Sequence, residues 1–245
     1  MEIISIYTSE IDKDLEEQIM KCFNITFSEN KPSNYFKWKY KDNPFGDSLH
    51  VIVIDNNQVI ATRVFWRLDI NGVESYQCVD TSVLPEYQGK GIFGKTVRTA
   101  LEQIGDKQIY NYPNENSAPA YLKYGWKPIE NSNCIKFNLK LLLLPSSPKI
   151  DWTKKQLEWR FENCLISKYY QYNDGDRYYI FGLRREKWPV LLGYSEFSLN
   201  LEYINPLFCF SYDVNSKGIC IRKKLIYMYK FKNELNLKSY LFDMI

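Results

Sequence analysis

Residues 49–84 contain three successive stretches with strand character, and the connections between them are long enough only for tight turns. The stretches read LHVIVID, VIATRVFWRLDI and VESYQCVDTSVL, and the turns between them are NNQ and NG. Asn71-Gly72 is a typical hairpin pair, because both residues accept the positive φ angles of the favoured two-residue turn. A parallel connection needs a crossover of roughly a dozen residues or more. The three strands are therefore predicted to be antiparallel, which excludes a purely parallel α/β sheet.

Helix and strand patterns alternate on both sides of these three strands. Upstream, residues 3–7 alternate like a strand, DKDLEEQIMKCF has apolar residues at helical spacing, and SNYFKWKYKDNP predicts a short helix that stops before Pro44. Downstream follow a helix in IFGKTVRTALEQI ending at Gly105, a strand in KQIYNY, a helix in SAPAYLKY and a strand in NCIKFNLKLLLL. Residues 1–144 are thus predicted to form an α+β fold, with a mixed, mostly antiparallel sheet flanked by helices.

The stretch YQGKGIFGKT, residues 87–96, matches three phosphate-binding patterns at once. It contains GxGxxG, the dinucleotide fingerprint, GxxxxGK[ST], the nucleotide triphosphate loop, and QxxGxF, which is close to the pyrophosphate loop of acetyltransferases. In a dinucleotide fold the strand leads directly into the first glycine, but here PEYQ intervenes. A triphosphate loop needs a later apolar strand ending in Asp, whereas VIVID, ending at Asp55, lies upstream. The GKT sequence is accordingly interpreted as coincidental.

Two separate segments resemble the GNAT superfamily of acyl-CoA N-acyltransferases. SVLPEYQGKGIF is similar to its strand-to-helix segment, V-x-P followed by a short spacer and [RQ]xxGx[GA]. NENSAPAYLKYGW, residues 114–126, is similar to its later segment, in which an Asn precedes a helix that carries a Tyr four residues before a Gly. Phe93 is a departure, since the superfamily commonly has Gly or Ala there. The resemblance implies a GNAT fold over residues 1–144 and acetyl-CoA as cosubstrate.

The resemblance also implies where the cosubstrate would be held. Glycines let the backbone approach a pyrophosphate, and a helix N-terminus favours an anion. The expected cofactor-binding residues are Val83, Gln88, Gly89, Lys90, Gly91, Ile92, Phe93, Gly94, Lys95 and Asn114.

The same resemblance suggests catalytic groups. The amide of Val83 would polarise the acetyl carbonyl, and Tyr121 would protonate the departing thiolate. The attacking amine must be neutral, so a base has to remove its proton. Asp80 is the first candidate for this base and Glu74 is the second. The implied reaction is direct transfer of an acetyl group to a primary amine in a ternary complex.

Composition narrows the alternatives. The chain has one histidine, His50, which removes most Ser-His-Asp, Cys-His and multi-histidine metal schemes, and its six cysteines contain no CxxC pair. No metal is expected. A net charge of +3 with interspersed acids does not favour a nucleic-acid partner. The acidic N-terminus and the short LKLLLLP run predict a cytoplasmic protein that contacts no membrane.

An internal sequence similarity predicts a second domain. FKWKYKDN at 36–43 and LEWRFENC at 157–164 share Trp and a basic residue in register, and strand pairs follow both. With PSSPK at 145–149 read as a linker, residues 145–245 are expected to form a degenerate GNAT-like domain that covers the acceptor site. The alternative is that Trp38 and Trp159 are independent aromatic anchors of two helices.

Three functions stay open at this point. The leading one is N-acetyl transfer to a small acceptor such as an amino sugar or a nucleotide sugar. The second is a non-catalytic acyl-CoA-binding or sensor module with an intact glycine loop. The third is an aminoacyl transferase of tandem GNAT architecture, which predicts a charged-tRNA donor and a basic groove.

Overall fold

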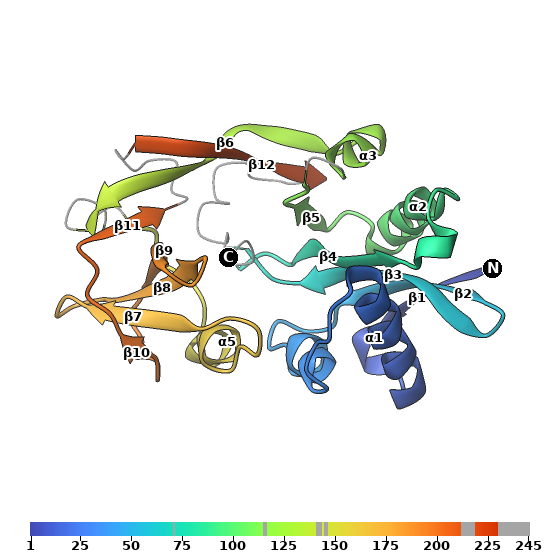
Figure 1. Ribbon diagram of the computed structural model, residues 1–245, viewed down its shortest axis with the longest axis horizontal. Coiled ribbons are helices and arrows are strands. Elements are labelled where there is room, and N and C mark those ends of the chain that lie inside the picture. Colours follow the sequence, from blue (N-terminus) through green and yellow to red (C-terminus); the bar gives the residue numbers. More distant parts are fainter. Residues whose placement is uncertain (71, 115–116, 141–143, 145–146, 212–218, 230–245) are drawn as a thin grey trace. The chain divides into compact units, whose positions relative to one another are not determined.

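A computed structural model describes residues 1–70, 72–114, 117–140, 144, 147–211 and 219–229, with the backbone alone for 129–135 and 220–229 (Figure 1). Two compact units are present. Unit 1 comprises residues 1–69, 73–127 and 227–232, and unit 2 comprises residues 70–72, 128–226 and 233–245. In the described part of the chain, no helix is long and apolar enough to cross a bilayer.

Unit 1 is built on a sheet with the strand order β1-β2-β3-β4-β5. Strands β1 (Glu2–Tyr7), β2 (Leu49–Asp55), β3 (Gln58–Arg67) and β4 (Ser75–Val83) pair antiparallel in succession. The predicted antiparallel strands are therefore confirmed. Asn56 and Asn57 form the β2–β3 turn with φ angles of 49° and 59°, as the favoured hairpin turn requires. Asn71, half of the second predicted turn, lies outside the described residues.

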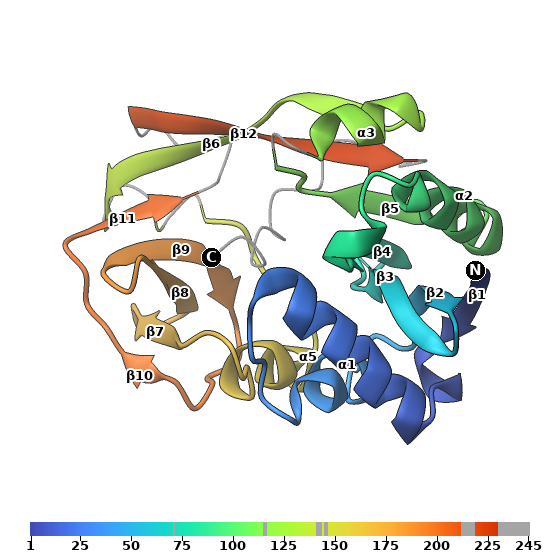
Figure 2. The same ribbon diagram turned by 45° about the vertical axis from the view of Figure 1, so that its right-hand side comes forward.

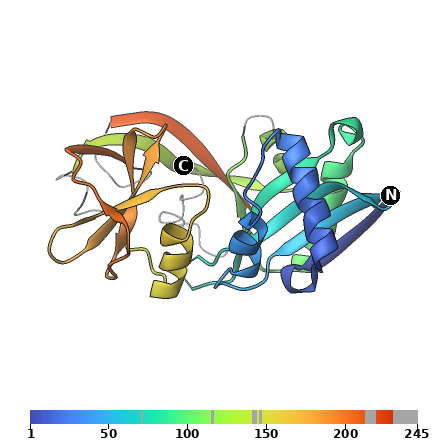
Figure 3. The same cartoon turned by 60° about the horizontal axis from the view of Figure 1, so that its bottom comes forward.

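Helices cover both faces of these strands. Helix α1 (Lys13–Phe27) packs on β3 and β4, and α2 (Ile92–Ile104) packs on β1, β2 and β3 (Figures 1 and 3). The two helices lie on opposite faces, because α1 contacts Ser82 while α2 contacts Arg63, whose neighbour Thr62 faces Ser82. Helix α2 begins and ends where the glycine loop and Gly105 predict. Helix α3 (Ala118–Lys123) then follows β5 (Gln108–Asn111).

A core of apolar residues lies between the sheet and helices α2 and α3. It contains residues from β2, β3, β4 and β5 together with residues of both helices. Its buried members are Leu49, Val51, Phe65, Tyr76, Cys78, Ala100, Ile104, Ile109, Tyr121 and Trp126. Burial of this apolar surface fixes α3, and therefore Tyr121, against the sheet.

Strand β4 has two features that position the site. A register shift places Arg63 of β3 opposite two residues of β4, which is a β-bulge, and within it Asp80 has a φ angle of 46°. Strand β5 pairs parallel with β4 only from Ser75↔Gln108 to Gln77↔Tyr110. Beyond Gln77, β4 continues for six residues, to Val83, without a partner on that edge among the described residues.

Unit 2 repeats much of this arrangement. After α5 (Lys154–Leu157), strands β7 (Tyr169–Asn173), β8 (Tyr178–Arg184) and β9 (Trp188–Ser195) pair antiparallel, and β11 (Phe208–Ser211) pairs parallel with β9. Unit 1 has the same succession in β2, β3, β4 and β5. At its outer edge β10 (Glu202–Tyr203) pairs parallel with β7.

The two similar octapeptides, residues 36–43 and 157–164, adopt the same local structure. Each forms one π-helical turn, η2 (Lys37–Lys41) in unit 1 and η5 (Glu158–Glu162) in unit 2. The closing i→i+5 hydrogen bonds are 2.8 Å from Asp42 N to Lys37 O and 2.9 Å from Asn163 N to Glu158 O. Both turns bury a tryptophan, a basic residue and a further aromatic. π-helical turns are rare, and these two lie at equivalent positions of the two octapeptides.

The last strand in each unit comes from the other half of the chain. Strand β6 (Lys127–Leu139) follows α3 in sequence, yet it pairs antiparallel with β11. Strand β12 (Ile219–Tyr229) follows β11, yet Tyr227–Tyr229 pair antiparallel with β5 (Figure 2). The chain thus leaves unit 1 at 127/128, and it returns at 226/227. In the predicted linker at 145–149, the carbonyl of Pro148 accepts from Tyr194 N of β9, and Lys149 forms an isolated β-bridge with Tyr194.

Candidate active site

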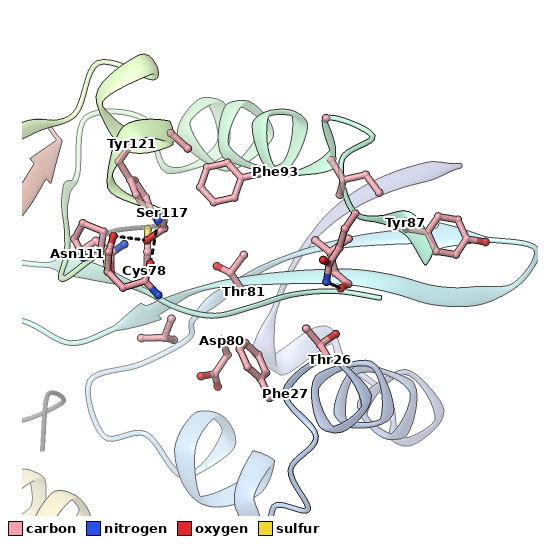
Figure 4. Close-up of a pocket in the computed structure, with 18 of the residues that line it drawn as sticks. Thr26, Phe27, Cys78, Asp80, Thr81, Tyr87, Phe93, Asn111, Ser117 and Tyr121 are labelled. Carbon is pink, nitrogen blue, oxygen red and sulfur yellow. Dashed lines mark hydrogen bonds between the residues drawn. The ribbon is translucent and has the colours of Figure 1, made fainter. Parts of the chain in front are cut away.

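A cavity of about 620 Å³ opens in unit 1 beside the unpaired edge of β4 (Figure 4). Its walls come from the end of α1, strand β4, the glycine loop, the start of α2, the segment after β5, and α3. The lining residues are Thr26, Phe27, Cys78, Val79, Asp80, Thr81, Val83, Tyr87, Gln88, Gly89, Gly91, Ile92, Phe93, Asn111, Tyr112, Pro113, Asn114, Ser117, Ala120 and Tyr121. Nine of the twelve predicted site residues are among them.

The glycine loop leaves open space above its backbone. Gly89 and Gly91 both have φ angles of 74°, and a Cβ atom added to either would meet nothing within 4 Å. Such angles favour glycine, because other residues are strained there. Gly91 is the N-cap of α2 and supplies no side-chain cap, and the first intrahelical bond runs from Lys95 N to Gly91 O at 3.3 Å. The amides that precede Lys95 in the first turn are therefore unsatisfied within the helix and suited to an anion.

Val83 presents its backbone to the same cavity. Leu84 N donates to Ile60 O of β3 at 2.9 Å, and in an antiparallel ladder consecutive residues face opposite edges. The amide and carbonyl of Val83 therefore face away from β3, toward the edge of β4 that β5 no longer pairs with. The carbonyl accepts a hydrogen bond from Gln88 Nε2 at 3.1 Å, which anchors the glycine loop to β4.

Tyr121 lies on the inner wall, close to Cys78 (Figure 4). Its hydroxyl accepts a hydrogen bond from Arg63 Nη1 at 3.1 Å, and it also hydrogen-bonds the Cys78 thiol. Its ring meets that of Phe93 edge to face at a centroid distance of 5.5 Å. Burial, which outweighs the charge of Arg63, raises the pKa of Tyr121 well above its usual value. The hydroxyl is therefore protonated throughout the physiological pH range.

Asp80 lies at the other side of β4, in a cluster of donors. Lys39 Nζ is 3.1 Å from each carboxylate oxygen, Tyr35 Oη is 3.3 Å from Oδ2, and Tyr40 also donates a short hydrogen bond to Oδ2. Lys39 and Tyr40 come from the π-helical turn η2 and are buried. Oδ1 accepts from Lys39 alone among the described residues, so one face of the carboxylate is left for a ligand.

Three of the twelve predicted site residues, and also Glu74, the second candidate base, do not line the cavity. Lys90 lies over the ring of Tyr87, with Nζ 4.8 Å from its centroid, and Lys95 is exposed. Gly94 faces α3 instead, where a Cβ atom would lie 1.7 Å from Tyr124 Oη, so this glycine permits close packing. Glu74, the second candidate base, hydrogen-bonds Tyr76 and pairs with Arg67 and Lys107 away from the cavity.

Asn114 lines the cavity and also binds the first residues of the helix that carries Tyr121. Its Oδ1 accepts from Ser117 N at 2.9 Å, and its carbonyl accepts from Ala118 N at 2.9 Å. These bonds begin α3 and thereby position Tyr121.

Several residues that contact Tyr121 or Asp80 are not evident in the sequence as site residues. Arg63, Lys39, Tyr35 and Tyr40 lie in strand and helix patterns that predict only packing, and Cys78 reads as a buried strand residue. A basic residue at the core-facing position of a strand is the one available signal, and Arg63 carries it in ATRVFW.

His50 takes no part in the cavity. It is the second residue of β2, is buried, and lies 3.0 Å from Thr8 Oγ1 through Nε2. Burial lowers its pKa to about 3, so the imidazole is neutral in the folded protein.

Comparison with known proteins agrees with this geometry. The model of the GNAT acetyltransferase domain matches residues 8–129. No curated protein sequence matches the chain significantly.

Solved structures share the fold over nearly the whole chain. A GCN5-related N-acetyltransferase from Kribbella flavida is similar with a TM-score of 0.59 and 11% identity, over 93% of this chain and 71% of that one. A Pyrococcus horikoshii protein is similar with a TM-score of 0.57 and 11% identity, over 97% of this chain and 92% of that one. Eis1 from Mycobacterium abscessus is similar with a TM-score of 0.56 and 12% identity, over 89% and 67%. At such identities the similarity concerns the fold. Through the domain at residues 8–129, the chain belongs to the GNAT family of acetyltransferases.

Proposed function

We propose that unit 1 transfers an acetyl group from acetyl-CoA to a primary amine of a small acceptor, directly and within a ternary complex. The observation that carries this proposal is the shared cavity. One continuous space is lined by the glycine loop, the unpaired edge of β4, Tyr121 and Asp80. An anion site, a carbonyl-polarising amide, a proton donor and a carboxylate base are the four parts that this reaction needs.

The residues present fit the cosubstrate. Gly89 and Gly91 leave room for a pyrophosphate next to the α2 amides, and the edge of β4 offers backbone groups to an extended arm. Acetyl-CoA supplies an acyl group activated as a thioester. The amide of Val83 would then donate to the acetyl carbonyl oxygen, where negative charge develops in the transition state.

Tyr121 is proposed as the proton donor to the leaving sulfur. Tyr121 lines the cavity, and its hydroxyl is protonated because burial raises its pKa. As the amine nitrogen bonds to the acetyl carbon and the carbon–sulfur bond breaks, the sulfur takes the electron pair. One proton leaves the nitrogen and one joins the sulfur, so the reaction balances without another reactant.

Asp80 is proposed as the base. It is the only carboxylate among the described residues that line the cavity. Its Oδ2 is held by Tyr35, Tyr40 and Lys39, while Oδ1 has capacity to accept from the acceptor amine, directly or through a water molecule. These donors orient the carboxylate before the acceptor arrives.

Direct transfer is favoured over an acyl-enzyme. Cys78 is the one thiol on the described cavity wall, and burial raises its pKa to about 12. A protonated thiol is a weak nucleophile. We therefore expect no covalently acetylated enzyme during turnover.

The acceptor is proposed to be an amino sugar or its nucleotide-linked form. Phe27 and Tyr112 present aromatic surface to the cavity near the polar groups of Thr26 and Asp80. A sugar offers an apolar ring face for such rings and a polar rim for the hydroxyl and carboxylate groups. We further propose that the half of the chain after residue 144 arose by duplication, as the paired π-helical turns support.

The test is CoA release with a panel of primary amines, measured with a thiol reagent and accompanied by acetyl-CoA binding. Release that requires an added amine, and that falls in Tyr121→Phe, is the expected result. Saturable acetyl-CoA binding without release on any amine would instead identify a non-catalytic binding module. Absence of acetyl-CoA binding would remove the proposed function altogether.

A further inference from the structure

Arg63 is a fully buried guanidinium directly behind the proposed proton donor. It lies on β3 opposite the β4 bulge, with an exposed fraction of 0%. Nε donates to Thr96 Oγ1 at 3.2 Å, Nη1 donates to Tyr121 Oη at 3.1 Å, and the guanidinium carbon is 4.1 Å from the centroid of the Phe93 ring. Helix α2, helix α3 and the sheet therefore all contact this one side chain.

The charge of Arg63 has no carboxylate partner in the described part of the chain. No ion pair involves it, and Nη2 is buried without a hydrogen-bond partner there. The one carboxylate residue of the bulge, Asp80, is bound instead by Lys39 and Tyr40. Buried guanidinium groups are always protonated and are normally paired, because an uncompensated buried charge is costly. Such a group suits a negative charge that is present only part of the time.

We propose that Arg63 is a positioning residue for the leaving-group step, acting through Tyr121. This inference rests on the proposed function and goes beyond it, because it places a fixed positive charge behind the departing thiolate. Arg63 itself does not line the cavity, so its contact with the reaction is the Tyr121 hydroxyl.

The hydrogen-bond geometry explains how this works. A phenol has one proton and two lone pairs, and Arg63 Nη1 occupies one lone pair of Tyr121 Oη. The Tyr121 proton must therefore point away from Arg63, toward the Cys78 side of the cavity. A neighbouring cation also strengthens the O–H as a donor, since it stabilises the charge that develops on the phenol oxygen.

The groups around Arg63 are consistent with this role. The titratable side chains that interact with it are Tyr121 on α3 and Cys78 on β4. Burial raises the pKa of both, whereas the positive charge of Arg63 acts in the opposite direction. Thr96 and Phe93, both from α2, fix the guanidinium without neutralising it.

A double-mutant cycle in turnover is the first test. Arg63→Met should lower kcat about tenfold to a hundredfold with little change in acetyl-CoA affinity, and Arg63→Lys should fall between Met and wild type. In a Tyr121→Phe background, Arg63→Met should have almost no further effect on kcat, because both changes remove the same contact. Arg98→Met, an exposed arginine on α2, is the matched control. An equal loss of kcat in both backgrounds would overturn the proposal.

A second test needs no turnover. The affinities of CoA and of desulfo-CoA, which lacks the thiol, are measured by calorimetry from about pH 6.5 to 9.5, across the ordinary thiol pKa. In the wild type, CoA should gain affinity relative to desulfo-CoA as pH rises, since the thiolate is stabilised. Arg63→Met should lose most of this gain, and if it does not fold, Arg63→Lys should show a reduced gain.

The outcomes separate the two proposals. An identical pH dependence in wild type and variant would overturn the role of Arg63, while amine-dependent CoA release would still support the acetyltransferase. CoA binding with the expected pH dependence but no release would support an interaction of Arg63 with the CoA thiolate through Tyr121, and would remove both the transfer reaction and the role of Arg63 in its leaving-group step. A wild type that binds no CoA would overturn both.

Discussion

The ammonium nitrogen of Lys39 lies 3.1 Å from each carboxylate oxygen of Asp80. The two side chains are 9% and 16% exposed, so the pair is largely shielded from solvent. Lys39 comes from a π-helical turn and Asp80 from a β-bulge. Two irregular backbone segments are thus joined by one ion pair at the edge of the cavity.

Loss of the Lys39 ammonium should destabilise the protein strongly. Lys39→Met keeps a flexible chain of similar length but leaves Asp80 without its cation, which for a shielded pair costs about 3 kcal/mol. Lys37→Met is the matched control, because Lys37 pairs with Asp42 at the surface and its loss should cost within about 0.5 kcal/mol. Urea denaturation measures both, and equal midpoints would contradict the structural role of the pair.

Asp80→Asn should lower kcat about a hundredfold, since an amide cannot accept the proton of the acceptor amine. Asparagine tolerates the φ angle of 46° at this position, so the substitution changes charge and not backbone geometry. Acetyl-CoA affinity should change far less than kcat. Initial rates and calorimetry, taken below the melting temperature of the variant, provide the comparison, and an unchanged kcat would exclude Asp80 as the base.

Gly91→Ala should weaken acetyl-CoA binding. The φ angle of 74° strains any other residue by about 1 kcal/mol, and the new methyl group would occupy the open space above the loop. Gly105→Ala, at the other end of α2 with a φ angle of 67° and equally open surroundings, should lose stability but keep its affinity. Equal losses of affinity in both variants would show that the loop contributes only to folding.

His50 should make the protein less stable as the pH falls. Burial lowers its pKa from 6.5 in the unfolded chain to about 3, partly opposed by the charge of Asp80. Below pH 6.5 the unfolded state binds a proton that the folded state excludes. Stability is therefore full above that pH and falls by about 1.4 kcal/mol per pH unit toward the folded pKa.

The chain has a single histidine, so this titration can be assigned directly. The difference in unfolding free energy between wild type and His50→Gln should grow in favour of the variant from pH 7 to about pH 5. A constant difference, or an imidazole NMR signal that titrates near 6.5 in the folded protein, would be inconsistent with burial of a neutral ring.

Local signals explain why much of unit 1 was predictable. Helix α2 follows from apolar spacing between two glycines, and the β2–β3 hairpin follows from a turn of two asparagines. The glycine loop, Tyr121 and Asn114 belong to short motifs whose geometry is largely local. Residues of both motifs line the same cavity.

The remaining site depends on how distant strands and helices meet. The bulge at Asp80 is a property of the β3–β4 register, which no single segment encodes. Whether Arg63 has a carboxylate partner depends on the side chains that α2 and α3 place next to it. The alternating pattern of β3 predicts only that residue 63 faces the core, where an apolar residue is expected. The π-helical turn of η2 was predicted only as a helix, since its extra residue depends on packing of Trp38, Lys39 and Tyr40.

The pairing of β5 with β12 sets an order of events during synthesis on the ribosome. Among the described elements of unit 1, all except the end of β12 have emerged once residue 127 has left the exit tunnel. The partner of Ile109–Asn111 is made about a hundred residues later, at Tyr227–Tyr229. Until then this strand has an open edge, and open edges invite pairing with other chains. A nonsense mutation anywhere between these points would therefore release a product that carries the whole cavity lining and a sheet ready to aggregate.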